Sequence, residues 1–288
     1  MKVSRRVLEL LVERIDLNDL KRVMSGWKVS VRDVKSKRDA VKVMLKAGLS
    51  PVRLEELLAL ADFAEKLPFT YWRIYRFPPL ERITPGILEK RLNRILSRVK
   101  EETCYFRVLR VEKGLLYVFY RYRRDDGLVK GWVGIRAEQF TDHVKCLVKS
   151  NGLLLVEEAG RAEMVVKMIS DALGVSIEPL MIPPFILREL AEEGKVKRAV
   201  VLLDGQITGV KGLSRVVLEG DDILKGVEKL RSRQELNFWA AGPLLEIETD
   251  EFNVSSEGRI SLRKADGTAA MKQLLQLAEK LAEKTCKP

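Results

Sequence analysis

Apolar residues in the first part of the chain recur with the period of an α-helix. Val7, Leu8 and Leu11 occur at helical spacing and predict a helix over residues 3–14. The same periodicity, bounded by capping residues, predicts three further helices at residues 16–24, 36–47 and 52–66. These helices can bury a shared apolar face, so residues 1–67 are expected to form a helical bundle domain.

The pattern changes after Pro68, where helical and strand-like segments follow one another. Thr84 and Pro85 are typical of a helix start, and an amphipathic run then continues to Lys100. Strands are predicted at residues 103–111, 115–123 and 128–135, joined by turns at Lys113-Gly114 and Asp126-Gly127. Residues 69–155 are therefore expected to form a β-rich basic middle domain with a mostly antiparallel sheet.

The C-terminal part alternates short strands and helices without the regular rhythm of a parallel sheet. Helices are predicted at residues 161–173, 185–193, 221–231 and 268–284, and strands at 196–203, 214–219, 244–248 and 259–264. We expect residues 156–288 to form an α/β association domain. The predicted fold class is α+β, with an N-terminal helical bundle, a mostly antiparallel β-rich domain and a C-terminal α/β domain.

The composition is typical of a globular intracellular protein. Apolar residues make up 46% and charged residues 32% of the 288 positions, which argues against a disordered or fibrous chain. The three cysteines are scattered without Cys-x-x-Cys spacing, so neither disulfides nor a zinc site is predicted. We find no transmembrane segment and no signal peptide. We expect no cofactor, no metal and no membrane contact, and a location in the cytoplasm or at the nucleoid or chromatin.

The positive charge is concentrated in the first half of the chain. Residues 1–150 hold 33 Lys and Arg against 19 Asp and Glu, a net charge of +14, whereas residues 151–288 carry a net charge of −3. Such an asymmetry attracts polyanions to one end of a molecule, and nucleic acid is the commonest polyanion partner. The alternative is a stable protein with a generously charged surface.

A first basic cluster lies in the loop after the second predicted helix and in the third predicted helix. Its seven bases are interrupted only by Asp33 and Asp39. Backbone amides at a helix start, together with nearby lysines, suit phosphate groups, and the alternative is a solvated helix face. The segment is similar to the helix-loop-helix of SAP-type DNA-binding modules, and Trp27 is expected to anchor the core. The bases are Lys28, Arg32, Lys35, Lys37, Arg38, Lys42 and Lys46.

A second basic cluster lies on the helix predicted from Pro85, opposite an apolar stripe that includes Leu88 and Leu92. Only Glu89 interrupts the bases, so helix-stabilising ion pairs do not explain the row. A polyanion is the more natural counter-charge, although a solvated face is again the alternative. The bases are Lys90, Arg91, Arg94 and Arg98.

A third basic cluster combines arginines with aromatic residues on predicted strands. Alternation places Arg121 and Arg123 on the sheet face of Tyr117 and Phe119. Such a face can hold a nucleic-acid backbone and stack on bases, but arginines also commonly cover aromatic surface in sheets. The bases are Arg121, Arg123, Arg124 and Lys130.

Few residues have a pattern that suggests catalysis. His143 is the only histidine, which leaves no His-ligated metal cluster and a weak basis for a catalytic triad. The glycines at residues 205–212 lack the spacing of a phosphate-binding loop. Glu219, Asp221 and Asp222 could bind a divalent ion, but carboxylates also favour the first turn of a helix. No catalytic residue is predicted, and we expect a protein that is not an enzyme.

Five segments of the chain, together with the order of the predicted elements, suggest a family. They are Ile15–Trp27, Glu138–Val144, Glu158–Ile169, Leu213–Leu224 and Gly258–Lys264. In these segments and in element order, the chain resembles centromere protein N and its yeast counterparts. The resemblance implies a pyrin-like helical N-terminal domain, a β-rich middle, and a C-terminal region that pairs with a related subunit. It also implies that bases of the first two domains hold DNA.

The charge distribution and the resemblance lead to the same expected function. We expect a non-enzymatic protein that binds double-stranded DNA through its backbone, and that forms a homodimer or pairs with a related subunit. One alternative is an RNA-binding factor that stacks bases on Tyr117, Phe119 and Trp132. A second, less favoured alternative is a metal-dependent nuclease built on Glu219, Asp221 and Asp222.

Overall fold

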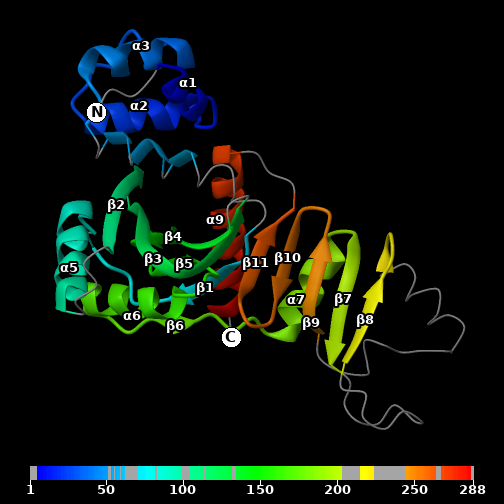
Figure 1. The fold of residues 1–288 in the computed structure, drawn as a ribbon. Helices are drawn as coiled ribbons and strands as arrows, with labels where there is room; N and C mark the ends of the chain where they lie inside the picture. Colours follow the sequence, from blue (N-terminus) through cyan, green and yellow to red (C-terminus); the bar gives the residue numbers. More distant parts are fainter. Residues whose placement is uncertain are drawn as a thin grey trace, which may run out of the picture. The chain divides into compact units, whose positions relative to one another are not determined.

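The chain folds into α-helices and antiparallel β-strands, which confirms the predicted α+β class (Figure 1). It divides into two compact units, Trp72–Pro179 and a unit formed by Met1–Tyr71 with Leu180–Pro288. The computed structural model describes residues 5–50, 53–54, 56–58, 60–61, 70–81, 83–98, 104–112, 114–131, 134–202, 215–223, 244–263 and 267–286.

The N-terminal segment folds into a bundle of helices that share a buried core. Its helices are α1 (Arg5–Glu13), α2 (Leu17–Gly26) and α3 (Lys37–Ala47). Asp16 and Ser36 accept hydrogen bonds at the starts of α2 and α3, as their sequence positions predict. Of the fourth predicted helix, the described residues between 53 and 61 are helical. The bundle core consists of Leu8, Leu11, Val12, Ile15, Leu20, Met24, Val34, Ala40, Val41, Met44, Leu57 and Ala61.

The middle unit contains one antiparallel sheet with the order β2-β3-β4-β5-β1, and β6 pairs with β1. The mostly antiparallel sheet expected here is present. Its strands are β1 (Trp72–Arg76), β2 (Tyr105–Glu112), β3 (Leu115–Gly131), β4 (Gly134–Lys149), β5 (Leu153–Glu157) and β6 (Glu178–Pro179).

Two helices, α5 (Pro85–Arg98) and α6 (Ala162–Leu173), share a buried core with one face of this sheet. The stripe of α5 contributes Leu88, Leu92 and Leu96, and alternate residues of the strands complete the core. The compact unit therefore continues past residue 155 to Pro179, and α6, which we expected in the third domain, packs within it.

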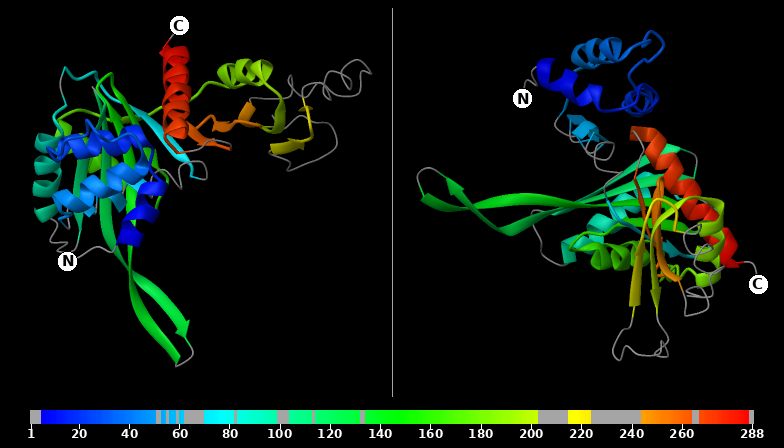
Figure 2. Two further views of the ribbon diagram at one scale, coloured as in Figure 1. Left: turned by 90° about the horizontal axis from the view of Figure 1, so that it is seen from above. Right: turned by 90° about the vertical axis from the view of Figure 1, so that its right-hand side faces the viewer.

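The hairpin formed by β3 and β4 is longer than the sequence predicted. Asp126-Gly127 is not a turn, because β3 continues through it to Gly131 and pairs with β4 along its length. The register shifts between Arg124 and Gly127, where Asp125 and Asp126 oppose the single residue Gln139, as in a β-bulge. Beyond the pairing with the neighbouring strands, β3 and β4 extend as a two-stranded ribbon (Figure 2).

The C-terminal sheet has the order β11-β10-β9-β7-β8, and its strands are antiparallel. Helices α7 (Pro184–Glu193) and α9 (Gly267–Cys286) contact it and are joined to each other by ion pairs of Lys280 and Lys284 with Glu189 and Glu193. The strands are β7 (Val196–Leu202), β8 (Arg215–Glu219), β9 (Leu244–Thr249), β10 (Phe252–Ser255) and β11 (Arg259–Leu262).

Gly152 ties the loop after β1 to the turn before β5. It has a φ of +95°, and its carbonyl oxygen accepts a hydrogen bond of 2.9 Å from the amide of Phe77. A Cβ atom at Gly152 would overlap the carbonyl oxygen of Phe77. Gly174, which ends α6 with a φ of +72°, has no atom within 4 Å of the same position.

We predict that Gly152→Ala lowers the free energy of unfolding by about 3 kcal/mol, because it adds steric overlap to backbone strain. Gly174→Ala is the control and should cost about 1 kcal/mol, since only the left-handed backbone is disfavoured there. Urea unfolding of the full chain followed by circular dichroism measures both values. Equal costs for the two variants would contradict the steric argument.

Candidate nucleic-acid interface

Helix α5 is fixed to the edge of the middle sheet by two of its side chains. The side-chain amide of Asn93 donates to the carbonyl oxygen of Phe106 at 3.0 Å, and the Phe106 amide donates to Asn93 Oδ1 at 2.8 Å. The amide of Val108 donates to Glu89 Oε2 at 2.8 Å. These contacts satisfy backbone groups of β2 that would otherwise need another strand.

The position of Glu89 explains why it interrupts the basic row of α5. Its carboxylate receives both the Val108 amide and the guanidinium of Arg107, which lies at 3.1 Å. Glu89 therefore faces the sheet and does not neutralise the exposed bases. In the described part of α5, the exposed face holds Lys90, Arg91, Arg94 and Arg98 and no acidic residue.

The four bases of this face do not have the same role. Arg91 donates to the carbonyl oxygen of Ala172 at 3.0 Å, near the C-terminal end of α6. A cation is stabilised at this end of a helix by the helix dipole. Lys90, Arg94 and Arg98 are exposed and make no ion pair or side-chain hydrogen bond within the described residues.

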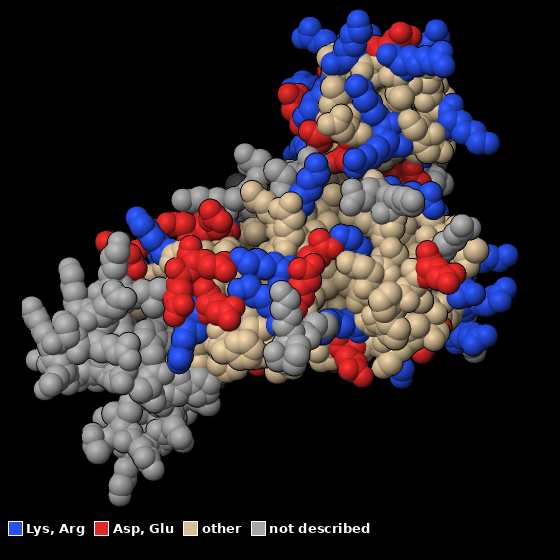
Figure 3. Space-filling model, turned by 180° about the vertical axis from the view of Figure 1, so that it is seen from behind, with Lys and Arg blue, Asp and Glu red and all other residues tan. Residues whose placement is uncertain are grey.

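The bases of the helical bundle divide in the same way. Lys37 donates to the carbonyl oxygen of Glu13 at 2.5 Å, and Lys42 lies 3.9 Å from Asp39. The bases without a partner among the described residues, all of them exposed, are Lys28, Arg32, Lys35, Arg38 and Lys46. In Figure 3, Lys and Arg side chains gather over the bundle and also on the side of α5.

The start of α3 is already occupied by the protein's own carboxylate. The Ser36 hydroxyl donates to Asp39 Oδ2 at 2.7 Å, and the Asp39 amide donates to Ser36 Oγ at 3.2 Å. The hydrogen bond from Ser36 lowers the pKa of Asp39, so the negative charge is stabilised at this helix start. The Ser36 cap and the negative charge of Asp39 both disfavour a phosphate at this helix start, so the side chains are the candidate contacts.

In the third basic cluster, packing explains the position of Arg121. Arg121 donates to the Tyr105 hydroxyl at 3.2 Å and lies over its ring, 5.7 Å from the centroid, while Arg107 lies 5.6 Å from the same centroid. Tyr117 and Phe119 are buried, with 1% and 7% of their surface exposed. Arg123, Arg124 and Lys130 lie on the β3 backbone, but their side chains are outside the described part of the structure.

Two of the residues considered for catalysis, His143 and Glu219, make contacts with neighbouring side chains. The ring of His143 lies 4.9 Å from that of Phe119, and Glu219 forms an ion pair with Arg198 at 3.3 Å. Among the described residues, which include Glu219, Asp221 and Asp222, no group of three side chains could hold a metal ion. The glycine-rich segment at residues 205–212 lies outside the described residues.

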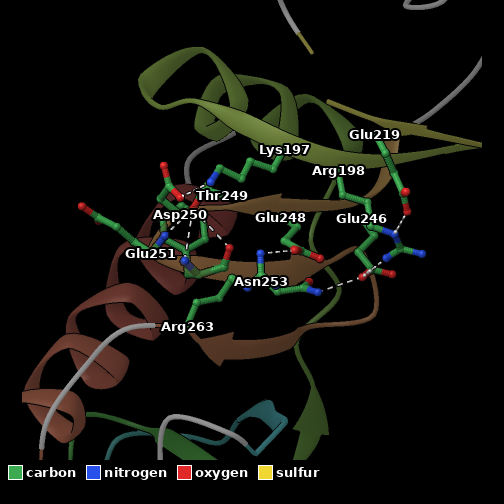
Figure 4. A network of polar contacts seen from close by, with 11 residues as sticks. Lys197, Arg198, Glu219, Glu246, Glu248, Thr249, Asp250, Glu251, Asn253 and Arg263 are labelled. Atoms are coloured by element: carbon green, nitrogen blue, oxygen red, sulfur yellow. Dashed lines mark hydrogen bonds and ion pairs between the residues drawn. The ribbon is translucent and has the colours of Figure 1, made fainter. Parts of the chain in front are cut away.

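The open face of the C-terminal sheet shows the opposite arrangement, in which basic side chains lie beside acidic ones (Figure 4). Arg198 pairs with both Glu219 and Glu246, Lys197 pairs with Asp250 at 2.6 Å, and Arg263 pairs with Glu248. Charges that are matched within the protein attract a polyanion much less than unmatched charges do.

Two arginines that hold parts of these basic surfaces in place, Arg53 and Arg107, were not identified from the sequence. Arg53 donates to the carbonyl oxygens of Gly48 and Trp27 and lies over the Trp27 ring, so it joins the ends of α2 and α3. No local signal predicts this contact. Arg107 was detectable, because alternation along β2 places it on the face of Tyr105.

Comparisons with known proteins give no family: no family model matches the chain, and no curated protein matches it. Among the helices that the structure describes, none has the length and apolar character needed to cross a membrane.

We predict that Arg91→Gln lowers the free energy of unfolding by about 1–2 kcal/mol, because it removes a charged donor from the end of α6. Arg94→Gln should change it by less than about 0.5 kcal/mol, since the Arg94 side chain has no partner within the described residues. Urea unfolding separates the two variants. An equal effect of both would mean that the Arg91 contact does not contribute to stability.

Proposed function

We propose that this protein is a non-enzymatic DNA-binding protein that holds the duplex backbone with bases of its N-terminal half. The observation that carries the proposal is the exposed face of α5, where Lys90, Arg94 and Arg98 have no partner among the described residues while Glu89 is committed to the sheet. Unmatched lysine and arginine side chains are what phosphate binding requires. The resemblance to centromere protein N, with a pyrin-like or SAP-like N-terminal domain, is part of the same proposal.

Duplex DNA is favoured over single-stranded RNA by the burial of aromatic residues. Single-strand binding depends on exposed rings that stack on bases, and Tyr117 and Phe119 are buried. The third ring of that alternative, Trp132, lies outside the described residues. The nuclease alternative is the less favoured one: Glu219 forms an ion pair with Arg198, and among the described residues no group of three side chains could hold a metal ion.

We predict that replacing Lys90, Arg94 and Arg98 with glutamine weakens binding to duplexes of any sequence. Each phosphate contact that the substitutions abolish should make the slope of log affinity against log salt shallower by about 0.9. Fluorescence anisotropy with labelled duplexes of unrelated sequence, at several salt concentrations, measures this. The matched control replaces Arg188, Lys195 and Lys272, three exposed bases of the C-terminal part, with glutamine. Equal affinity loss in both triple variants would argue against a defined DNA path.

The second part of the proposal is that the C-terminal region pairs with a second copy of the chain through the edge strand β8. β9 offers no free edge, because it is paired on both sides, with β7 and β10. β8 lies at the end of the sheet and pairs only with β7 among the described strands.

The sequence of β8 is self-complementary in an antiparallel pair. The amide of Gly220 donates to the carbonyl oxygen of Lys197, so the backbone groups of Arg215, Val217 and Glu219 face the free edge. A pair centred on Val217 places Arg215 opposite Glu219 of the second copy on both sides of the axis. Val217 is 45% exposed.

We predict that the wild-type protein is a dimer by light scattering and that Arg215→Glu shifts it to monomer, because two pairs of like charges then meet. The double variant Arg215→Glu/Glu219→Arg restores opposite charges and should restore the dimer. A wild-type monomer, or a dimer that the single variant leaves intact, would exclude this interface.

A further inference from the structure

The basic turn, defined as residues 27–35 between α2 and α3, has an alternating pattern of packed and exposed side chains. Val34 is buried, and Val29 and Val31 pack against the bundle core. Lys28, Arg32 and Lys35 lie between or beside these valines and are exposed. The valines therefore anchor the backbone from which the three bases project.

Lys28 has a backbone conformation that lysine rarely adopts. Its φ is +61°, and it is the one residue other than glycine with a positive φ in the described part of the chain. The Lys28 amide donates to Ser25 O and the Val29 amide to Met24 O, both at 3.0 Å, which is the hydrogen-bond pattern of a Schellman helix end. Glycine is the usual residue at this position because it has no Cβ.

Arg53 clamps this turn from the side of the bundle. Its guanidinium donates to the carbonyl oxygen of Trp27 at 3.1 Å and to that of Gly48 at 3.0 Å, and it lies 5.4 Å from the centre of the Trp27 ring. The Trp27 indole in turn donates to Glu56 at 2.5 Å. A strained residue persists where its surroundings fix the backbone, and such residues concentrate at functional positions.

We propose that the basic turn is where the helical bundle binds the phosphodiester backbone, with Lys28, Arg32 and Lys35 as the phosphate contacts and Arg53 as a positioning residue. This inference rests on the proposed function and assigns it to one element of the bundle. A preformed turn loses little backbone conformational freedom when it binds, so little of the interaction free energy of its charges is spent on ordering the turn.

The competing element is the exposed face of α3, which carries Arg38, Lys42 and Lys46. There Lys42 lies beside Asp39, and the negative charge of Asp39 is stabilised by Ser36. The basic turn also contains one exposed acid, Asp33, which reduces its net charge.

The test compares two triple variants that remove the same charge. One replaces Lys28, Arg32 and Lys35 with glutamine, and the other replaces Arg38, Lys42 and Lys46 with glutamine. With a mixed-sequence duplex, the turn variant should raise the Kd by about ten times more, and its salt slope should fall by about 0.9 for each phosphate that is no longer bound. Equal effects of the two variants would overturn the assignment to the turn. DNA binding that still depends on α5 would then leave the proposed function standing.

A single substitution at Lys28 separates binding from stability. Lys28→Gly relieves the backbone strain, so the thermal midpoint should rise while duplex binding weakens several-fold. Lys28→Arg keeps the charge and should keep the affinity. Because Lys28→Gly should stabilise the fold, weaker binding by this variant cannot be attributed to unfolding. Binding as tight as that of the wild type would contradict the proposal.

Asp33 and Arg53 give two further readouts. Asp33→Asn removes a charge that repels phosphate and should tighten binding several-fold. Arg53→Lys keeps the charge but cannot bridge both carbonyl oxygens, so it should weaken binding. The double variant Arg53→Lys/Lys28→Gly should then lose less binding free energy for duplex DNA than the sum of the losses in the two single variants, because both substitutions act on the same contact. Fully additive losses would remove Arg53 from the mechanism.

Discussion

The exchange of hydrogen bonds between Asn93 and the backbone of Phe106 is the contact on which the middle unit and its basic surface both depend. β2 ends the sheet of this unit, and an uncovered edge strand would expose unpaired backbone groups. Because α5 supplies side chains in place of a neighbouring strand, its orientation about its own axis is fixed. The stripe of Leu88, Leu92 and Leu96 then faces the core, and the arginines face away from it.

This arrangement also decides the electrostatic character of the surface. Had the carboxylate of Glu89 pointed toward solvent, its negative charge would offset part of the positive charge of this helix. Its use as an acceptor for the Val108 amide and for Arg107 removes it from that face. The same contact that stabilises the sheet edge therefore leaves a row of bases without acidic neighbours.

Much of the fold was predictable because helix ends and apolar periodicity are local properties. Ser36, Gly48 and Pro85 mark helix boundaries that the structure confirms, since capping depends on residues that are adjacent in sequence. Asp126-Gly127 was misassigned because the same dipeptide that favours a turn also suits a bulge in a long ribbon, and strand pairing decides between them. The candidate site was predictable as a set of charges, yet the contact of Arg91 with Ala172 and the clamp of Arg53 join residues that lie far apart in the chain. Charge predicts which partner is attracted, whereas tertiary contacts decide which individual bases are free to bind it.

The two halves of the chain differ in net charge and also in how many of their bases form ion pairs within the protein. The C-terminal sheet is not poor in basic residues, but Lys197, Arg198 and Arg263 each contact a carboxylate on a neighbouring strand or loop. Cross-strand pairs of this kind stabilise a solvated sheet face and leave little field beyond it. On α5, the carboxylate of Glu89 is instead bound by the Val108 amide and Arg107. At the start of α3, Asp39 accepts a hydrogen bond from Ser36, and in the turn before it the single acid Asp33 is outnumbered by bases. A phosphate backbone, with its closely spaced negative charges, can supply the counter-charge that these surfaces lack.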